Sequence, residues 1–133
     1  INFTSVGIGN IPLSLQVSTS QVVQNGSNTE IIMSYYDSVT TDMADSRIIT
    51  PTYAPGTYNW NGTTTTISGY VYYMGQLFTV DPMPTSGSTT LTSTPAPGGN
   101  IIGTFSGPVT LLSTGAPQLQ GTLSASFDVY RNN

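Results

Sequence analysis

The sequence predicts an all-β fold, an Ig-like or Greek-key β-sandwich, and three observations lead to this prediction. Apolar and polar residues alternate with a period of two in several segments, whereas helical periodicity is scarce. Eight Tyr, four Phe and one Trp stand among many Val, Ile and Thr, residue types that favour strands. Clusters of Gly and Pro separate the alternating segments, at Pro55-Gly56, 82–84 and 95–99. Several short strands at this spacing are typical of a sandwich.

Four strands are expected in the body of the chain, within 29–35, 67–73, 101–111 and 119–130. Pro108 falls inside the third of them and indicates a sheet edge or a bulge. Within each of these four segments, alternate residues are expected to share one face of the strand. These residues are, segment by segment, Thr29, Ile31, Met33 and Tyr35; Ile67, Gly69, Val71 and Tyr73; Ile101, Gly103, Phe105, Gly107, Val109 and Leu111; and Leu119, Gly121, Leu123, Ala125, Phe127 and Val129.

The N-terminal segment 1–11 has a different pattern, because its apolar residues are spaced by glycines and it ends just before Pro12. It reads as extended chain, either as an ordinary strand of the sandwich or as a detached strand. A detached strand of this length would span about 36 Å, enough to lie along a neighbouring subunit's sheet. We therefore divide the chain into an N-terminal tail, 1–11, and a head domain, 12–133.

The composition excludes most enzyme chemistry. The chain has no Cys, no His and no Lys, and it carries two Arg and six carboxylates. Thiolate, imidazole and Schiff-base chemistry are therefore closed, as are zinc sites built from Cys or His. Two cations cannot neutralise a phosphate backbone, so nucleic acid is not an expected partner. We expect no enzyme, no cofactor, no metal and no membrane span in the mature chain.

Two carboxylate hypotheses remain open at this stage. Asp37, Asp42 and Asp45 could form a calcium loop, but they lack the ligand alternation and glycine of an EF-hand, and Asp is an ordinary turn former. An acid hydrolase would need two paired carboxylates, for which Glu30 and Asp128 are the candidates. Neither residue stands in a sequence typical of such an enzyme.

The sequence also contains a group of aromatic residues whose role is open. It could form a platform on which a carbohydrate stacks, or it could consist of core residues and cross-strand pairs of a half-buried sheet. The residues of this group are Trp60, Tyr70, Tyr72 and Tyr73.

Three Asn-X-Ser/Thr triplets match the N-glycosylation rule, at Asn2, Asn25 and Asn61. A chain so rich in Asn, Ser and Thr also forms such triplets by chance. Asn25 and Asn61 are each followed by Gly, which indicates exposed turns. We expect N-linked glycans at Asn25 and Asn61, and treat Asn2 as the third candidate.

The shortage of charge indicates an acidic surrounding outside the cell. In strong acid carboxylates become neutral, while every Lys, Arg and His stays positive. A chain that lacks Lys and His and is rich in Ser and Thr stays hydrated without repelling itself. Because the chain starts at Ile1, without a charged and an apolar leader region, we expect an exported protein whose signal peptide has been cleaved.

The extended Ile1–Ile11 segment, the Thr/Ser-rich all-β body and the three sequons together resemble the subunit of archaeal thread filaments from thermoacidophilic Sulfolobales. The resemblance implies a structural subunit of an extracellular cell-surface filament, with glycans as its coat. It also implies donor-strand complementation, in which the tail of one subunit completes the sheet of the next. The partners would be identical subunits, and the filament could contact other cells or surfaces. The implied donor-strand anchors are Phe3, Val6, Ile8 and Ile11.

A second reading is a monomeric secreted β-sandwich, acting as a surface adhesin or a carbohydrate-binding domain. Its N-terminal strand would pair within its own sheet. The segment 103–107, followed by the long final strand, also resembles small bacterial surface domains.

Overall fold

The computed structural model describes residues 2–5, 9–12, 16–25, 28–73, 75–94, 96–115 and 118–131, and of residues 2–25 it describes the backbone. This part of the chain contains strands and no helix, which confirms the predicted all-β class. None of it therefore forms an apolar helix that could cross a membrane. The strands are β1 (Asn2–Ser5), β2 (Gly9–Pro12), β3 (Gln16–Asn25), β4 (Asn28–Tyr36), β5 (Met43–Thr50), β6 (Gly56–Asn59), β7 (Thr66–Tyr73), β8 (Gln76–Val80), β9 (Ser88–Ser93), β10 (Asn100–Leu112) and β11 (Leu119–Tyr130).

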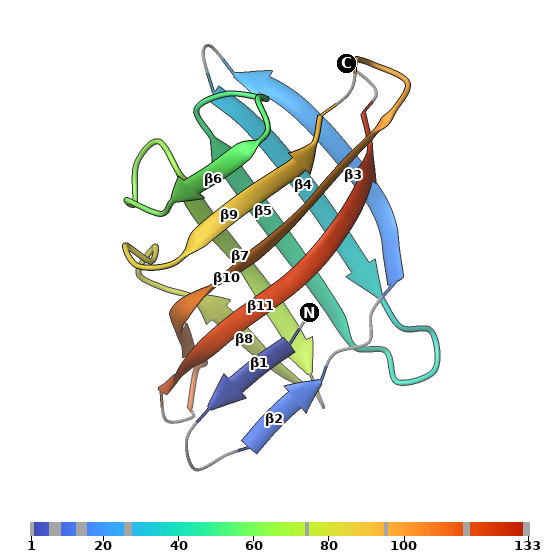
Figure 1. Ribbon diagram of the computed structural model, residues 1–133. Coiled ribbons are helices and arrows are strands. Elements are labelled where there is room, and N and C mark those ends of the chain that lie inside the picture. The colour runs from blue at the N-terminus through green and yellow to red at the C-terminus, as the bar shows by residue number, and fades with distance from the viewer. Residues whose placement is uncertain are drawn as a thin grey trace.

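These strands form one antiparallel sheet in the order β2-β1-β11-β10-β8-β7-β5-β4-β3, and β9 and β6 branch off β10. The sheet folds over itself into two layers (Figure 1). Strands β6, β9, β10 and β11 form the front layer, and β4, β5 and β7 cross behind them. The arrangement is consistent with a β-sandwich, and the Ig-like or Greek-key detail stays a prediction.

The predicted alternation is confirmed most clearly in β10, in which every second residue from Ile101 to Leu111 is buried. In β11, Leu123, Phe127 and Val129 are buried, as expected for the face that the sequence predicts. The Phe105 and Phe127 rings lie 6.3 Å apart between these two strands. Apolar side chains of both layers form a single core cluster, so burial on one face of each strand holds the layers together.

Strand β10 joins the two layers at Pro108. Residues 102–106 of β10 pair with β9, and Leu111 and Leu112 pair with β8. Pro108 lies between these two stretches and, on its other side, opposite Thr122 of β11. Since proline has no N–H to donate, it fits where the ladder passes from one neighbour strand to another.

Trp60 occupies the core beside two glycines. It is 2% exposed, and its Nε1–H donates to Thr89 Oγ1 at 2.9 Å. A Cβ atom added at Gly107 or Gly87 would collide with the indole ring. Gly107 is therefore the position in β10 at which the sheet leaves room for the indole ring of Trp60.

The N-terminal segment runs as two short strands of the same chain's sheet. β1 pairs antiparallel with Gly121–Ser124 of β11, and β2 pairs antiparallel with β1. The prediction of one continuous extended segment over 1–11 thus differs from this backbone, in which β1 and β2 run in opposite directions. The reason is that β1 offers a second edge to which β2 can add.

We predict that Gly107→Ala destabilises the head by about 1–3 kcal/mol, because the added methyl group overpacks the site against Trp60. Urea unfolding followed by Trp60 fluorescence measures the change. Ser106→Ala is the matched control on the exposed face of β10, and we expect it to change stability by less than about 0.5 kcal/mol. Equal stability of Gly107→Ala and the wild type would contradict the packing described for Trp60.

Candidate functional site

The outer edge of β11 is covered by β1 along only part of its length. β11 spans 12 residues, and β1 spans 4 residues. Within the described strands, residues 125–130 of β11 pair with β10 on one side and with no strand on the other. The unpaired N–H and C=O groups of such an edge are sites at which a further strand can add.

The second open edge belongs to β3. This strand pairs with β4 and ends the strand order of the described sheet. It approaches β11 without forming a ladder with it (Figure 1). The open edge of β3 and the partly open edge of β11 therefore lie near one another.

The four predicted donor-strand anchors divide between described and undescribed residues. Phe3 lies opposite the buried Leu123 of β11, and also opposite Ile11 of β2. Val6 and Ile8 lie outside the described residues. The register thus places Phe3 directly opposite the core residue Leu123, and Ile11 one strand further out, opposite Phe3.

Asn61, the best described of the three sequon residues, organises its own loop. Its Oδ1 accepts hydrogen bonds from the backbone N–H groups of Thr63, Thr64 and Thr65 at 2.9, 3.0 and 3.1 Å. Its Nδ2 donates to Thr64 Oγ1 at 2.8 Å. The loop is exposed, so a glycan on Nδ2 has room, but the same side chain also has a structural role.

The other two sequons lie in strands. Asn25 ends β3 opposite Asn28 of β4, as expected for a hairpin at this sequon, and residues 26 and 27 lie outside the described residues. Asn2 lies in β1, with β11 on one side and β2 on the other. Its position between two strands differs from the exposed loop of Asn61.

The acidic segment forms the turn between β4 and β5. Asp37 Oδ1 accepts from the backbone N–H groups of Val39 at 2.8 Å and Thr40 at 3.3 Å, and these bonds lower the pKa of the Asp37 carboxyl. Asp42 is buried, and Asp45 lies within β5. No three acidic side chains in the described part of the chain come close enough together to hold a metal ion.

The two carboxylates named for an acid hydrolase are not brought together. Glu30 lies on β4 and forms an ion pair with Arg47, with 2.6 Å between Oε1 and Nε. Asp128 is exposed on β11, in the other layer. The two therefore do not form the paired arrangement that glycoside hydrolysis needs.

The predicted aromatic group also separates. Trp60 belongs to the core, whereas Tyr70 and Tyr72 lie on the outer face of β7, on either side of the inward Val71. The backbone of Tyr73 ends β7. The residue that joins Tyr70 and Tyr72 on this face, Tyr36, was not identified from the sequence, although it shares the outward face of β4 with Ser34.

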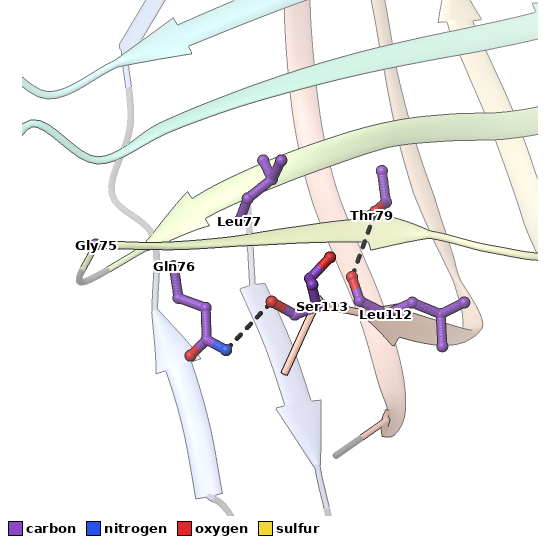
Figure 2. Close-up of a pocket in the computed structure, with 7 residues that line it drawn as sticks. Gly75, Gln76, Leu77, Thr79, Leu112 and Ser113 are labelled. Carbon is purple, nitrogen blue, oxygen red and sulfur yellow. Dashed lines mark hydrogen bonds between the residues drawn. The ribbon is translucent and has the colours of Figure 1, made fainter. Parts of the chain in front are cut away.

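A hollow of about 470 Å³ lies along β8 and the end of β10 (Figure 2). Gln76 Nε2 donates to Ser113 Oγ at 3.2 Å, and Thr79 Oγ1 donates to the carbonyl oxygen of Leu112 at 3.3 Å. The hollow is lined by Gly75, Gln76, Leu77, Thr79, Leu112, Ser113 and Thr114. Nothing in the sequence signalled it, because its two walls are more than thirty residues apart in the chain.

No family model, curated protein or solved structure matches the chain. What the molecule does is therefore inferred from its own residues.

We predict that the Asn61 sequon carries a glycan in protein made by a host that attaches N-glycans. Thr63→Ala should remove the mass of one glycan while leaving the backbone bonds to Asn61 Oδ1 in place, and Thr63→Ser should retain the glycan. Asn61→Ala should remove the glycan and also cost about 1 kcal/mol or more, because three backbone N–H groups lose their acceptor. Intact mass and thermal unfolding measure the two effects. A mass difference between the wild type and Thr63→Ala that equals the substitution alone would contradict glycosylation at Asn61.

We predict that the Asp37 turn loses stability in acid. The pKa of the folded carboxyl lies below that of the unfolded chain, so its contribution is present above the unfolded value and is lost as the pH falls through the folded one. The side-chain amide introduced by Asp37→Asn can accept the same hydrogen bonds without a titrating charge. The stability difference between wild type and Asp37→Asn, measured by thermal unfolding, should shrink as the pH falls below about 4. A difference that is constant with pH would contradict this role of the carboxylate.

Proposed function

We propose that the protein is the structural subunit of an extracellular cell-surface filament, assembled head to tail by strand addition. The observation that carries the proposal is the incompletely covered edge of β11, where β1 occupies four of the twelve residues. In the proposed filament this edge receives the N-terminal segment of another copy. The element that pairs within one chain is then exchanged between chains, as in domain swapping.

A tail donated in an extended conformation covers more of the edge than the hairpin does. In the register of β1, a tail that stays extended would continue the ladder from Gly121 to Leu119, the first residue of β11. Each anchor side chain that becomes fully buried contributes roughly 1.5–3 kcal/mol. The ordering of the tail offsets part of this gain. The balance favours donation when the acceptor edge would otherwise stay open.

Head-to-tail strand donation is a heterologous contact. The donor segment of one copy and the acceptor edge of the next are different surfaces, so every added copy again presents both. Contacts of this kind propagate into open filaments unless their rotation closes a ring. The chain has no Cys and no Lys, so the joints would be non-covalent ladders and packing.

The charge distribution supports a location outside the cell in an acidic medium. Each of the two arginines has an internal partner: Arg47 pairs with Glu30, and the Arg131 guanidinium lies 4.1 Å from the centroid of the Tyr53 ring. A cation over an aromatic ring keeps this attraction at any pH at which arginine is charged. Few charges suit a filament whose subunits must lie side by side in acid, because only the two arginines among the side chains stay charged there.

Mixed cysteine variants test donation between chains. Asn2 lies opposite Ser124, and the natural chain has no Cys to interfere. We predict that unglycosylated Asn2→Cys and Ser124→Cys chains, mixed under assembly conditions and oxidised, form a disulfide-linked dimer of one chain of each kind. Denaturing gel electrophoresis and peptide mapping identify the link.

The double variant, with both substitutions in one chain, is the matched control. A disulfide within single chains of the double variant, together with no linked dimer in the mixture, would establish pairing within the chain and reject the filament proposal. Deletion of residues 1–11 should leave a monomeric head that gains thermal stability when the free 1–11 peptide is added. A truncated chain that still forms filaments would also reject the donor role.

A further inference from the structure

The outer face of the rear layer carries two rows of side chains that run across four strands. Successive residues of a strand point to opposite faces, and the buried Met33, Ala44, Val71 and Phe78 define the inner one. The register of β4, β5, β7 and β8 places the outward residues of these strands opposite one another. The first row is Tyr36, Met43, Tyr72 and Leu77, and the second is Ser34, Asp45, Tyr70 and Thr79.

The first row is exposed and rich in aromatic and aliphatic surface. Tyr36 is 44% exposed and Leu77 is 50% exposed, and Met43 and Tyr72 are partly exposed between them. One strand separates β4 from β7, so the backbones that carry Tyr36 and Tyr72 are about 10 Å apart. The row therefore places two tyrosine side chains on the same face of the sheet, one strand apart.

The outer face of the front layer is mixed: Ile102 and Tyr130 are exposed on it, and neither belongs to an aromatic row across several strands. One of its rows consists of hydroxyl side chains across four strands. Its members are Thr57, Thr90, Thr104 and Ser126. The aromatic row of the rear face is thus a local feature and does not follow from the overall composition.

Both rear rows end at the hollow beside β8. Leu77 and Thr79 are their last members, and both also line the hollow of about 470 Å³ (Figure 2). Gln76, Ser113 and Thr114 add an amide and two hydroxyl groups to its wall. Amide and hydroxyl groups both donate and accept hydrogen bonds. The exposed row thus reaches one wall of the hollow at Leu77 and Thr79, while Gln76, which alternates with Leu77, lies on the other side of β8 (Figure 2).

We propose that this rear face binds an uncharged oligosaccharide, with Tyr36 and Tyr72 stacking on sugar rings and the hollow receiving sugar hydroxyl groups. The charges of the face support an uncharged ligand, because Glu30 and Arg47 neutralise one another and Asp45 is left beside Tyr70 as an acceptor. A tyrosine side chain combines an apolar ring with a polar hydroxyl group, and it therefore suits ligands that carry both apolar and hydrogen-bonding surface. The inference goes beyond the proposed filament and does not depend on it.

A carbohydrate fits this face better than a second copy of the chain does. The cores of stable protein interfaces are depleted of Asp and Ser, and here Asp45 and Ser34 lie directly beside the exposed row. The hydroxyl-lined recess continues the face and gives it hydrogen-bonding groups at one end. Stacking surfaces that end in convergent polar groups are typical of small-molecule sites.

Affinity electrophoresis of the full chain tests the proposal, with a β-linked glucan, an α-linked mannan and a galactan as soluble, uncharged probes. We expect at least one polysaccharide to retard the protein. Tyr36→Ala and Tyr72→Ala should each weaken the retarding interaction about tenfold or more, and Tyr72→Phe should retain it, because the ring is kept. Tyr130→Ala is the matched control, since Tyr130 is 55% exposed on the front face. Its binding should equal that of the wild type.

Three outcomes would overturn the proposal. The first is that none of the three polysaccharides retards the wild type. The second is that Tyr130→Ala weakens binding as much as Tyr72→Ala, which would indicate a non-specific effect of exposed tyrosine. The third is that the wild type forms a dimer that Tyr72→Ala abolishes while no polysaccharide binds, which would make the face a protein interface. Thermal unfolding of each variant separates loss of binding from loss of the fold. Since binding is measured with soluble chain, failure of the cysteine experiment leaves this test intact.

The oligosaccharide bound at this face could belong to the glycans of the protein itself or to a foreign polysaccharide. Competition by N-glycans released from the glycosylated protein distinguishes them. Competition by these glycans identifies a neighbouring copy as the source, and binding of polysaccharide without such competition identifies a separate surface. Both results support the site.

Discussion

The pairing of β10 with β11 is the interaction on which the rest of this structure depends. It joins Asn100–Leu112 to Leu119–Tyr130 along nearly their whole lengths. One edge of β10 pairs first with β9 and then with β8, so this strand connects the two layers. The other side of β11 holds β1. Loss of this pair would separate the layers, open the core and remove the edge on which the N-terminal segment lies.

Both proposed activities, strand addition and ligand binding, depend on what the sheet leaves uncovered. A closed barrel has no edges, whereas this sheet ends at β3 and leaves part of β11 open. The same incompleteness brings β8 beside the end of β10 with only two paired positions, and the hollow lies there. Strand addition at one edge and ligand binding near another are thus compatible, because they use different strands.

The chain combines few charges with internal pairing of its cations. Arg47 and Arg131 are each held by a neighbouring side chain, and one row of the outer front face consists of hydroxyl groups. Hydroxyl groups stay neutral from acid to neutral pH, so the hydration of this row changes little with pH. Stability must then come from ladders and apolar packing, which is what the continuous core cluster provides.

The sequence by itself determined the all-β class, the inward faces of β10 and β11 and the absence of thiol, imidazole and lysine chemistry. These properties are local, because side-chain alternation and residue type do not depend on which strands are neighbours. Only the tertiary structure decided that Pro108 marks the passage from β9 to β8, that Trp60 is a core residue and that Tyr36 shares a row with Tyr72. It also divided the N-terminal segment into β1 and β2. The physical reason is that each of these features joins residues far apart in the chain, and strand adjacency is set by the packing of the whole core and not by the pattern of any one strand.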